Sequence, residues 1–131
     1  MTDLAALLEG REIDVPTVGS SMWPRLKSGD VVRVAPLPAD GPRVGNIVLV
    51  ARDGGYVLHR VVRLTGNTVL TRGDNQPCPD TPVRPVAVLG VAIARERGGR
   101  SARLGRHGQR SAAWSTLVPL VYRARVRIFG R

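Results

Sequence analysis

Short valine-rich runs, each closed by glycine, proline or asparagine, recur through the first 94 residues of this chain. β-Branched residues favour strands, and closely spaced strands with such turn signals are typical of mainly β domains. We expect strands over residues 13–18, 30–35, 46–52, 56–64, 68–71 and 86–94. The Asp53-Gly54-Gly55 junction predicts a hairpin, and Gly90 predicts an irregularity in the last strand.

The remaining segments differ in composition. Residues 4–8 are mostly leucine and alanine and predict a short N-terminal helix ended by Gly10. Residues 95–109 hold five arginines and four glycines, which is typical of a flexible linker. Apolar residues beyond it fall near helical spacing, with arginines on another side. We therefore expect one folded domain over 1–94, an Arg/Gly-rich linker over 95–111, and a basic amphipathic tail over 112–131. We prefer a helix for the tail, although the alternation over 122–128 would also suit a strand.

Charge is concentrated at one end of the chain. Residues 1–94 carry ten basic and nine acidic side chains, whereas residues 95–131 carry ten arginines and one acid, Glu96. Such asymmetry indicates an anionic partner. We expect peripheral contact with an anionic membrane through residues 95–131. Nucleic acid is the less favoured partner, because aromatic residues are widely spaced in the tail.

Several classes of site and location are excluded by composition. The one cysteine, Cys78, excludes an internal disulfide and a cysteine-rich metal site. We expect no metal and no cofactor, since no motif for either is present. The N-terminus lacks the basic start and apolar stretch of a secretory signal, and no apolar run reaches the roughly 20 residues that span a bilayer. We therefore expect a cytoplasmic protein or one peripheral to the membrane.

Few residues could act as a base for a nucleophile. The chain has two histidines and one lysine. His107 lies in the expected linker and Lys27 in a turn, so both are expected to be solvated. His59 instead lies within a valine-rich strand, where a sheet would hold it in place. Ser20 and Ser21 follow Gly19 at the end of an extended stretch, where backbone N–H groups can converge on one point, as an oxyanion hole requires.

Four segments together resemble the type I signal peptidase family. Ser21-Met22-Trp23-Pro24 matches its Ser-Met-x-Pro signature, and Gly29-Asp30-Val31-Val32 resembles the Gly-Asp-x-Val strand that follows it. Residues 56–61 resemble the strand that carries the general base, and Gly73-Asp74-Asn75 resembles the Gly-Asp-Asn motif. The four occur in the order found in the family. The resemblance implies a LexA/signal-peptidase-like coiled β-sheet domain.

The resemblance also implies roles for individual residues. Most bacterial members have lysine as the base, so the histidine makes this chain similar to the archaeal and endoplasmic-reticulum type. Carried over, Ser21 is the nucleophile, His59 the base and Asp80 the orienting carboxylate. Asp74 and Asn75 then belong to a structural loop beside the site.

This chain departs from the signal peptidases in three ways. Many signal peptidases have a serine two positions before the nucleophile, where this chain has Gly19, as in LexA-type peptidases. We therefore expect the oxyanion hole to consist of the backbone of Gly19, Ser20 and Ser21. The membrane anchor that precedes the nucleophile and the large inserted domain of the enteric type are both missing from the sequence.

These observations predict a serine endopeptidase that cleaves a peptide or protein precursor, in the manner of signal peptide processing, after a small residue. The route would pass through an acyl-enzyme. Two alternatives remain. One is a LexA-like self-cleaving or regulatory peptidase module. The other is an inactive peptidase fold that binds a membrane or nucleic acid through its Arg-rich tail.

Overall fold

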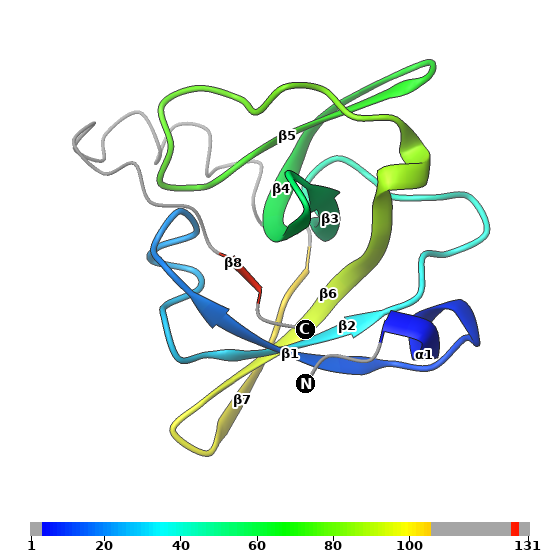
Figure 1. The fold of residues 1–131 in the computed structure, drawn as a ribbon. Coiled ribbons are helices and arrows are strands. Elements are labelled where there is room, and N and C mark those ends of the chain that lie inside the picture. The colour runs from blue at the N-terminus through cyan, green and yellow to red at the C-terminus, as the bar shows by residue number, and fades with distance from the viewer. Residues whose placement is uncertain (1–3, 106–126, 129–131) are drawn as a thin grey trace.

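A curved antiparallel sheet that closes on itself forms most of the molecule (Figure 1). The computed structural model describes residues 4–105 and 127–128. Its elements are α1 (Leu4–Leu8), β1 (Ile13–Val18), β2 (Val31–Ala35), β3 (Ile47–Arg52), β4 (Gly55–Thr65), β5 (Thr68–Arg72), a 3-10 helix η1 (Pro85–Ala87), β6 (Val88–Arg97), β7 (Arg100–Arg103) and β8 (Arg127–Ile128). The strand order is β2-β1-β8-β4-β3-β6-β7, and β2 also pairs with β6, so the path returns to β2 and forms a barrel. β5 pairs with β4 outside this ring.

The strands predicted over the first 94 residues are confirmed, and the first five agree with their predicted bounds to within one residue. The predicted hairpin joins β3 to β4. Arg52 faces Gly55 across it, and the two turn residues, Asp53 and Gly54, have φ values of 53° and 74°. Positive φ at both central positions suits the twist of a two-residue hairpin, and it explains the glycine.

The irregularity predicted at Gly90 is also confirmed. β3 and β6 shift register beside it, with Leu49 facing Gly90 and Val50 facing Val88. A Cβ atom at Gly90 would lie 2.7 Å from the carbonyl oxygen of Ala35 and 2.7 Å from a methyl group of Val34. Glycine is therefore required here by the close approach of β2.

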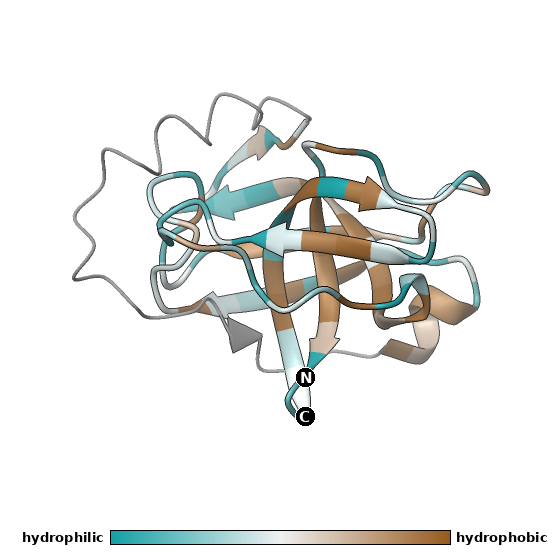
Figure 2. Cartoon of the chain, turned by 90° about the horizontal axis from the view of Figure 1, so that it is seen from above, coloured by the Kyte–Doolittle hydropathy of each residue, from teal (hydrophilic) through white to brown (hydrophobic). Residues whose placement is uncertain are grey.

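The sheet is buried on both faces, which gives the barrel two apolar clusters. Ile47 and Leu49 of β3 join one cluster, which contains Met22, Leu26 and residues of β1 and β2. The alternate residues of β3 join the other, which contains Val57 and Val61 of β4. In Figure 2 the apolar stretches accordingly lie along the strands and α1, whereas the connecting loops are mostly hydrophilic. Both clusters consist mainly of aliphatic side chains.

The linker expected from residue 95 is wrong over residues 95–103. β6 continues to Arg97, and Arg100–Arg103 returns as β7, paired antiparallel with β6. The turn between them consists of Gly98 and Gly99, with φ values of 57° and 78°. Two glycines with positive φ make a tight hairpin turn, so the glycines specify a turn here and not flexibility. The expected domain boundary at residue 94 thus falls inside a strand.

The expected C-terminal tail lies largely outside the described residues. Residues 106–111 of the linker and most of 112–131 are among those the structure does not describe. Arg127 and Ile128 are described, and they form β8. At these two positions the strand alternative holds, not the helix. No helix in the described part of the chain is long and apolar enough to cross a membrane.

Candidate active site

Ser21 lies in the turn where the chain leaves β1. Gly19 has a φ of 90°, which lets the backbone reverse direction directly after Val18. The following turn is fixed by backbone hydrogen bonds from Trp23 to Ser20 and from Leu26 to Met22. Met22 and Leu26 are fully buried in the larger apolar cluster, so they anchor the turn to the barrel. Met22 is therefore a packing residue.

His59 comes from the middle of β4, where it pairs with Val48 of β3. It alternates in phase with Val57 and Val61, which are both buried. The ring is held from two sides. The Oγ atom of Ser21 lies 3.0 Å from Nε2 of His59, and Oδ2 of Asp80 lies 2.5 Å from Nδ1. The structure thus brings together the three residues expected to act together, from segments that are far apart in the sequence.

Asp80 is fixed by more than its contact with His59. Its carboxylate also accepts a hydrogen bond of 2.9 Å from the hydroxyl of Thr71 in β5, and its backbone N–H donates to the carbonyl of Thr71. Burial alone would raise the pKa of Asp80. The hydrogen bond and positive charge of His59, the Thr71 hydroxyl and the charge of Arg52 outweigh burial and lower this pKa below its usual 3.8. Asp80 is therefore held as a carboxylate, the form that stabilises an imidazolium beside it.

Asp74 and Asn75 form the loop expected beside the site, but Asp74 acts through a side-chain partner. Its two carboxylate oxygens accept hydrogen bonds of 2.8 and 2.7 Å from Nε and Nη2 of Arg60. The remaining nitrogen of that guanidinium donates to the carbonyl of Gly45 at 2.8 Å. Arg60 is 1% exposed and Asp74 is 4% exposed, so this is a buried ion pair. The ion pair with Arg60 thus braces this loop.

The same loop holds the backbone of the turn that contains Ser20 and Ser21. Asn75 donates from its backbone N–H to the carbonyl of Ser21 at 2.7 Å, and from its side chain to the carbonyl of Ser20 at 3.0 Å. Gly73 passes so close that an added Cβ would lie 2.6 Å from the carbonyl oxygen of Ser21. The Gly-Asp-Asn sequence therefore has a physical cause at each position: close approach, the ion pair and the two hydrogen bonds.

Two of these residues, Arg60 and Thr71, have no role assigned by the motifs in the sequence. Arg60 directly follows His59 on a strand, and an arginine among buried valines indicates a buried acidic partner. Thr71 lies at a buried alternate position of β5, where a hydroxyl needs a partner. In both cases the signal was a polar residue at an apolar position. The partner itself depends on the three-dimensional pairing of β4 and β5.

The hydroxyl of Ser20 differs from that of Ser21. Its Oγ atom is buried and has no hydrogen-bond partner within the part of the chain that the structure describes. Ser21 and His59 are both 0% exposed. Ser21 and His59 are thus in contact but closed to solvent in this structure.

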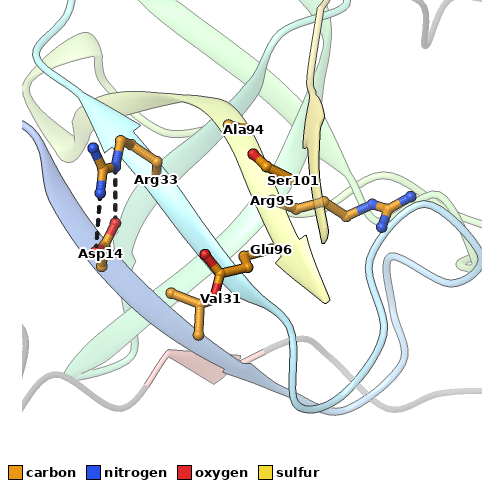
Figure 3. Close-up of a pocket in the computed structure, with 7 residues that line it drawn as sticks. All are labelled: Asp14, Val31, Arg33, Ala94, Arg95, Glu96 and Ser101. Atoms are coloured by element: carbon orange, nitrogen blue, oxygen red, sulfur yellow. Dashed lines mark hydrogen bonds and ion pairs between the residues drawn. The ribbon is translucent and has the colours of Figure 1, made fainter. Parts of the chain in front are cut away.

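An open pocket elsewhere on the barrel does not involve these residues. It lies over β1, β2, β6 and β7, and its walls include Asp14, Arg33 and Glu96 (Figure 3). Arg33 points toward Asp14, to which it donates two hydrogen bonds of 2.9 and 3.2 Å. None of Ser21, His59 and Asp80 lines it. Because the charges in its wall are of both signs, we assign it no ligand.

Comparison with known protein families gave a match to the Peptidase S24-like family over residues 15–93. This interval contains every residue of the cluster around Ser21 and more than half of the chain. Neither the curated proteins nor the solved structures gave a significant match. The family match and the closed antiparallel barrel together confirm the predicted fold class. The chain belongs to the Peptidase S24-like family.

Proposed function

We propose that this protein is a serine endopeptidase in which Ser21, His59 and Asp80 perform the catalysis. One observation carries the proposal. The Ser21 hydroxyl lies 3.0 Å from one ring nitrogen of His59, and the Asp80 carboxylate lies 2.5 Å from the other. A nucleophile, a base and a group that orients the base are the constellation needed for acyl transfer.

The geometry supports the following sequence of steps. Nε2 of His59 takes the Ser21 proton as Oγ attacks the carbonyl carbon of the scissile peptide bond. The bond to the amine then breaks, the amine leaves with the proton from His59, and the acyl group stays on Oγ. Water, deprotonated by His59, releases the acyl group as a carboxylic acid and restores the serine. Asp80 holds the ring through Nδ1 and stabilises its charged form throughout.

Backbone N–H groups of the turn at Gly19, Ser20 and Ser21 would stabilise the oxyanion. Burial of Met22 and the hydrogen bond from Asn75 to the Ser20 carbonyl fix this turn. Its amides would therefore be held in place before the reaction begins. Such fixed donors contribute most when they need no rearrangement. We expect no metal or cofactor to take part.

The substrate class rests on the Ser-Met-x-Pro and Gly-Asp-Asn resemblance. It favours a signal-peptidase-like enzyme with a histidine base, which cleaves a peptide or protein precursor after a small residue. The arginines at positions 95–131 would bring it to an anionic membrane surface. A LexA-like, self-directed peptidase is the second candidate, because β8 pairs with β1, the strand that ends three residues before Ser21.

A peptide library analysed by mass spectrometry tests the proposal. The native protein should cut a defined set of peptides, and Ser21→Ala and His59→Ala should each lose these cuts. Ser101→Ala, which removes an exposed hydroxyl on β7, is the matched control and should keep them. Anionic vesicles in a parallel series test whether a membrane surface is required.

Two results would decide against the proposal. Cuts that persist at native rates in Ser21→Ala would come from a contaminant or from another nucleophile. A library left uncut by the native protein, with and without vesicles, would favour an inactive peptidase fold.

A further inference from the structure

Arg52 ends β3 on the same face of the sheet as the reactive histidine. Alternate side chains of a strand share one face, so Arg52 continues the row formed by Val48 and Val50. Val48 lies directly opposite His59 on β4, and directly paired residues project to the same face of a sheet. The arginine thus extends a row of side chains that begins beside His59.

The guanidinium of Arg52 contacts the residue that follows Asp80. Its Nη2 atom donates a hydrogen bond of 2.6 Å to the carbonyl oxygen of Thr81, which lies 29 positions further along the sequence. Its Nε atom is buried, so the base of the guanidinium is enclosed by protein. The end of β3 therefore holds the residue next to the Asp80 carboxylate in the chain.

The loop around Asp80 has few backbone donors of its own. Three of the six residues in 77–82 are prolines, which have no N–H. Asp80 is buried, whereas its neighbours on both sides are exposed. Its backbone N–H donates to the carbonyl of Thr71 at 2.8 Å, and the loop rejoins β5 at Val83. Among the described residues, only Arg52 makes a hydrogen bond to the chain between these two points.

A small displacement of this loop would act directly on the histidine. The Oδ2 atom of Asp80 lies 2.5 Å from Nδ1 of His59, and this contact orients the ring toward Ser21. Catalytic groups must be held within about 0.5 Å of their productive geometry. The charge of Arg52 also acts on the carboxylate. Against the effect of burial, and together with the hydrogen bond from His59, it helps to lower the pKa of Asp80.

We propose that Arg52 is a positioning residue, which holds the loop so that the Asp80 carboxylate stays against Nδ1 of His59. In this role Arg52 makes no contact with the substrate and acts on the ring through Asp80. The inference rests on the proposed function in one respect, that the arrangement performs catalysis. The hydrogen bond between Asp80 and His59 can be measured without any turnover.

Proton exchange at the His59 ring tests the position of Asp80 directly. The full chain carries isotopically labelled histidine, and NMR follows the Nδ1–H resonance, assigned by its absence in His59→Ala. Arg52→Met keeps much of the side-chain length and removes the donors, whereas Arg52→Lys keeps a donor and the charge. Exchange with water should accelerate at least about tenfold in Arg52→Met and stay close to the native rate in Arg52→Lys. Arg63→Met removes an exposed arginine of β4 and is the matched control, which should keep the native rate.

Kinetics with a peptide that the native protein cuts gives a second readout. Arg52→Met should lower kcat by about 10–100-fold, because a misplacement of about 1 Å can cost this much. Arg52→Lys should recover most of the loss. KM should stay close to the native value in both variants, since the interaction that is lost affects the chemical step and not substrate binding.

Several results would overturn the inference. One is Nδ1–H exchange in Arg52→Met that is as slow as in Arg63→Met. Another is a general loosening of the fold, in which backbone amides of β1 and β2 exchange faster by the same factor as Nδ1–H. A loss in Arg52→Met that Arg52→Lys does not restore, or faster exchange with an unchanged kcat, would also refute the positioning role.

The outcomes separate this inference from the proposed function. Faster Nδ1–H exchange in Arg52→Met, restored in Arg52→Lys, supports the hold on Asp80 even if the native protein cuts no peptide. Native rates of cutting and of Nδ1–H exchange in Arg52→Met overturn the inference and leave the proposed function intact.

Discussion

The ion pair between Arg60 and Asp74 should be one of the largest single contributions to stability in this barrel. Arg60→Met keeps much of the side-chain volume and removes the guanidinium. It leaves the Asp74 carboxylate, 4% exposed, without two hydrogen bonds of 2.8 and 2.7 Å. Hydrogen bonds to charged groups contribute about 1.5–3 kcal/mol each, and loss of one partner from a buried pair costs about 3–5 kcal/mol. Both estimates agree on a loss of about 3–5 kcal/mol.

Urea unfolding followed by circular dichroism measures this loss, and the chain offers a matched control. Arg33 makes a similar two-bond contact with Asp14 on the surface, where both side chains are about half exposed. Arg33→Met should leave the midpoint of unfolding nearly unchanged, because water replaces the lost contact. Equal midpoints for Arg60→Met and Arg33→Met would refute the argument from burial.

A double-mutant cycle separates the pair from its surroundings. Asp74→Leu leaves Arg60 buried without its carboxylate, so it should also be costly. The double variant Arg60→Met/Asp74→Leu leaves no buried charge without a partner. Its loss of unfolding free energy should be smaller than the sum of the single losses by about 1–3 kcal/mol. Additive losses would mean that the two side chains contribute independently and that the pair is not the source of the effect.

Three further outcomes follow from the same contacts. Asp80→Asn should lower kcat/KM by about 10³–10⁴-fold in the peptide assay, because an amide at this position no longer fixes the donor at Nδ1 of His59, while Asp40→Asn on the surface should match the native rate. Gly73→Ala should lower the unfolding midpoint, at a cost of about 1–3 kcal/mol, since its Cβ would lie 2.6 Å from the Ser21 carbonyl oxygen; an unchanged midpoint would show that the loop relaxes freely. Arg97→Gln should move acid unfolding to higher pH. Burial opposes ionisation of Asp30, yet hydrogen bonds from Arg97 and from the Lys27 backbone hold the pKa of Asp30 below 3.8. That stabilisation is complete above the usual pKa of 3.8 and is lost as the pH falls through the lower pKa of the folded protein. Circular dichroism from pH 7 to 2 should show no difference between Arg97→Gln and the native protein if the pair is unimportant.

The sequence predicts the strands well because each is specified locally. Valine-rich runs and positive-φ turn residues, such as Asp53-Gly54, fix both the extended segments and where they reverse. Gly98-Gly99 is a local turn signal of the same kind, and it forms the turn between β6 and β7. The arginines and glycines around it gave the composition of a flexible linker, and that composition led to the wrong prediction.

The site was predicted in part, through motif resemblance. Ser21, His59 and Asp80 were assigned roles because their flanking residues match a family, and the structure brings the three together. Their catalytic roles stay predictions. Arg60 and Thr71 could not be assigned, because each has a partner that only the fold brings close. Pairing of β4 with β5 places Asp74 beside Arg60, and the loop after β5 returns Asp80 to Thr71. Polar residues at apolar strand positions show that a partner exists without showing which residue it is.

The position of β8 could not be predicted at all. The sequence of β8 does not indicate that this strand pairs with β1 and β4, because any residue can make backbone hydrogen bonds. Alternation over residues 122–128 suggested a strand as an alternative to a helix. It did not indicate which strands would receive it.

The long separation in sequence between Ser21 and His59 has a consequence for folding. The two residues are 38 positions apart, and the barrel closes through pairings that are also remote, such as β2 with β6. Non-local pairings of this kind form late and slowly, typically over milliseconds to seconds. A nascent or partly unfolded chain therefore contains a serine with no base beside it. On the proposed mechanism, a molecule that fails to fold has no activated serine, and peptidase activity arises only with the completed barrel.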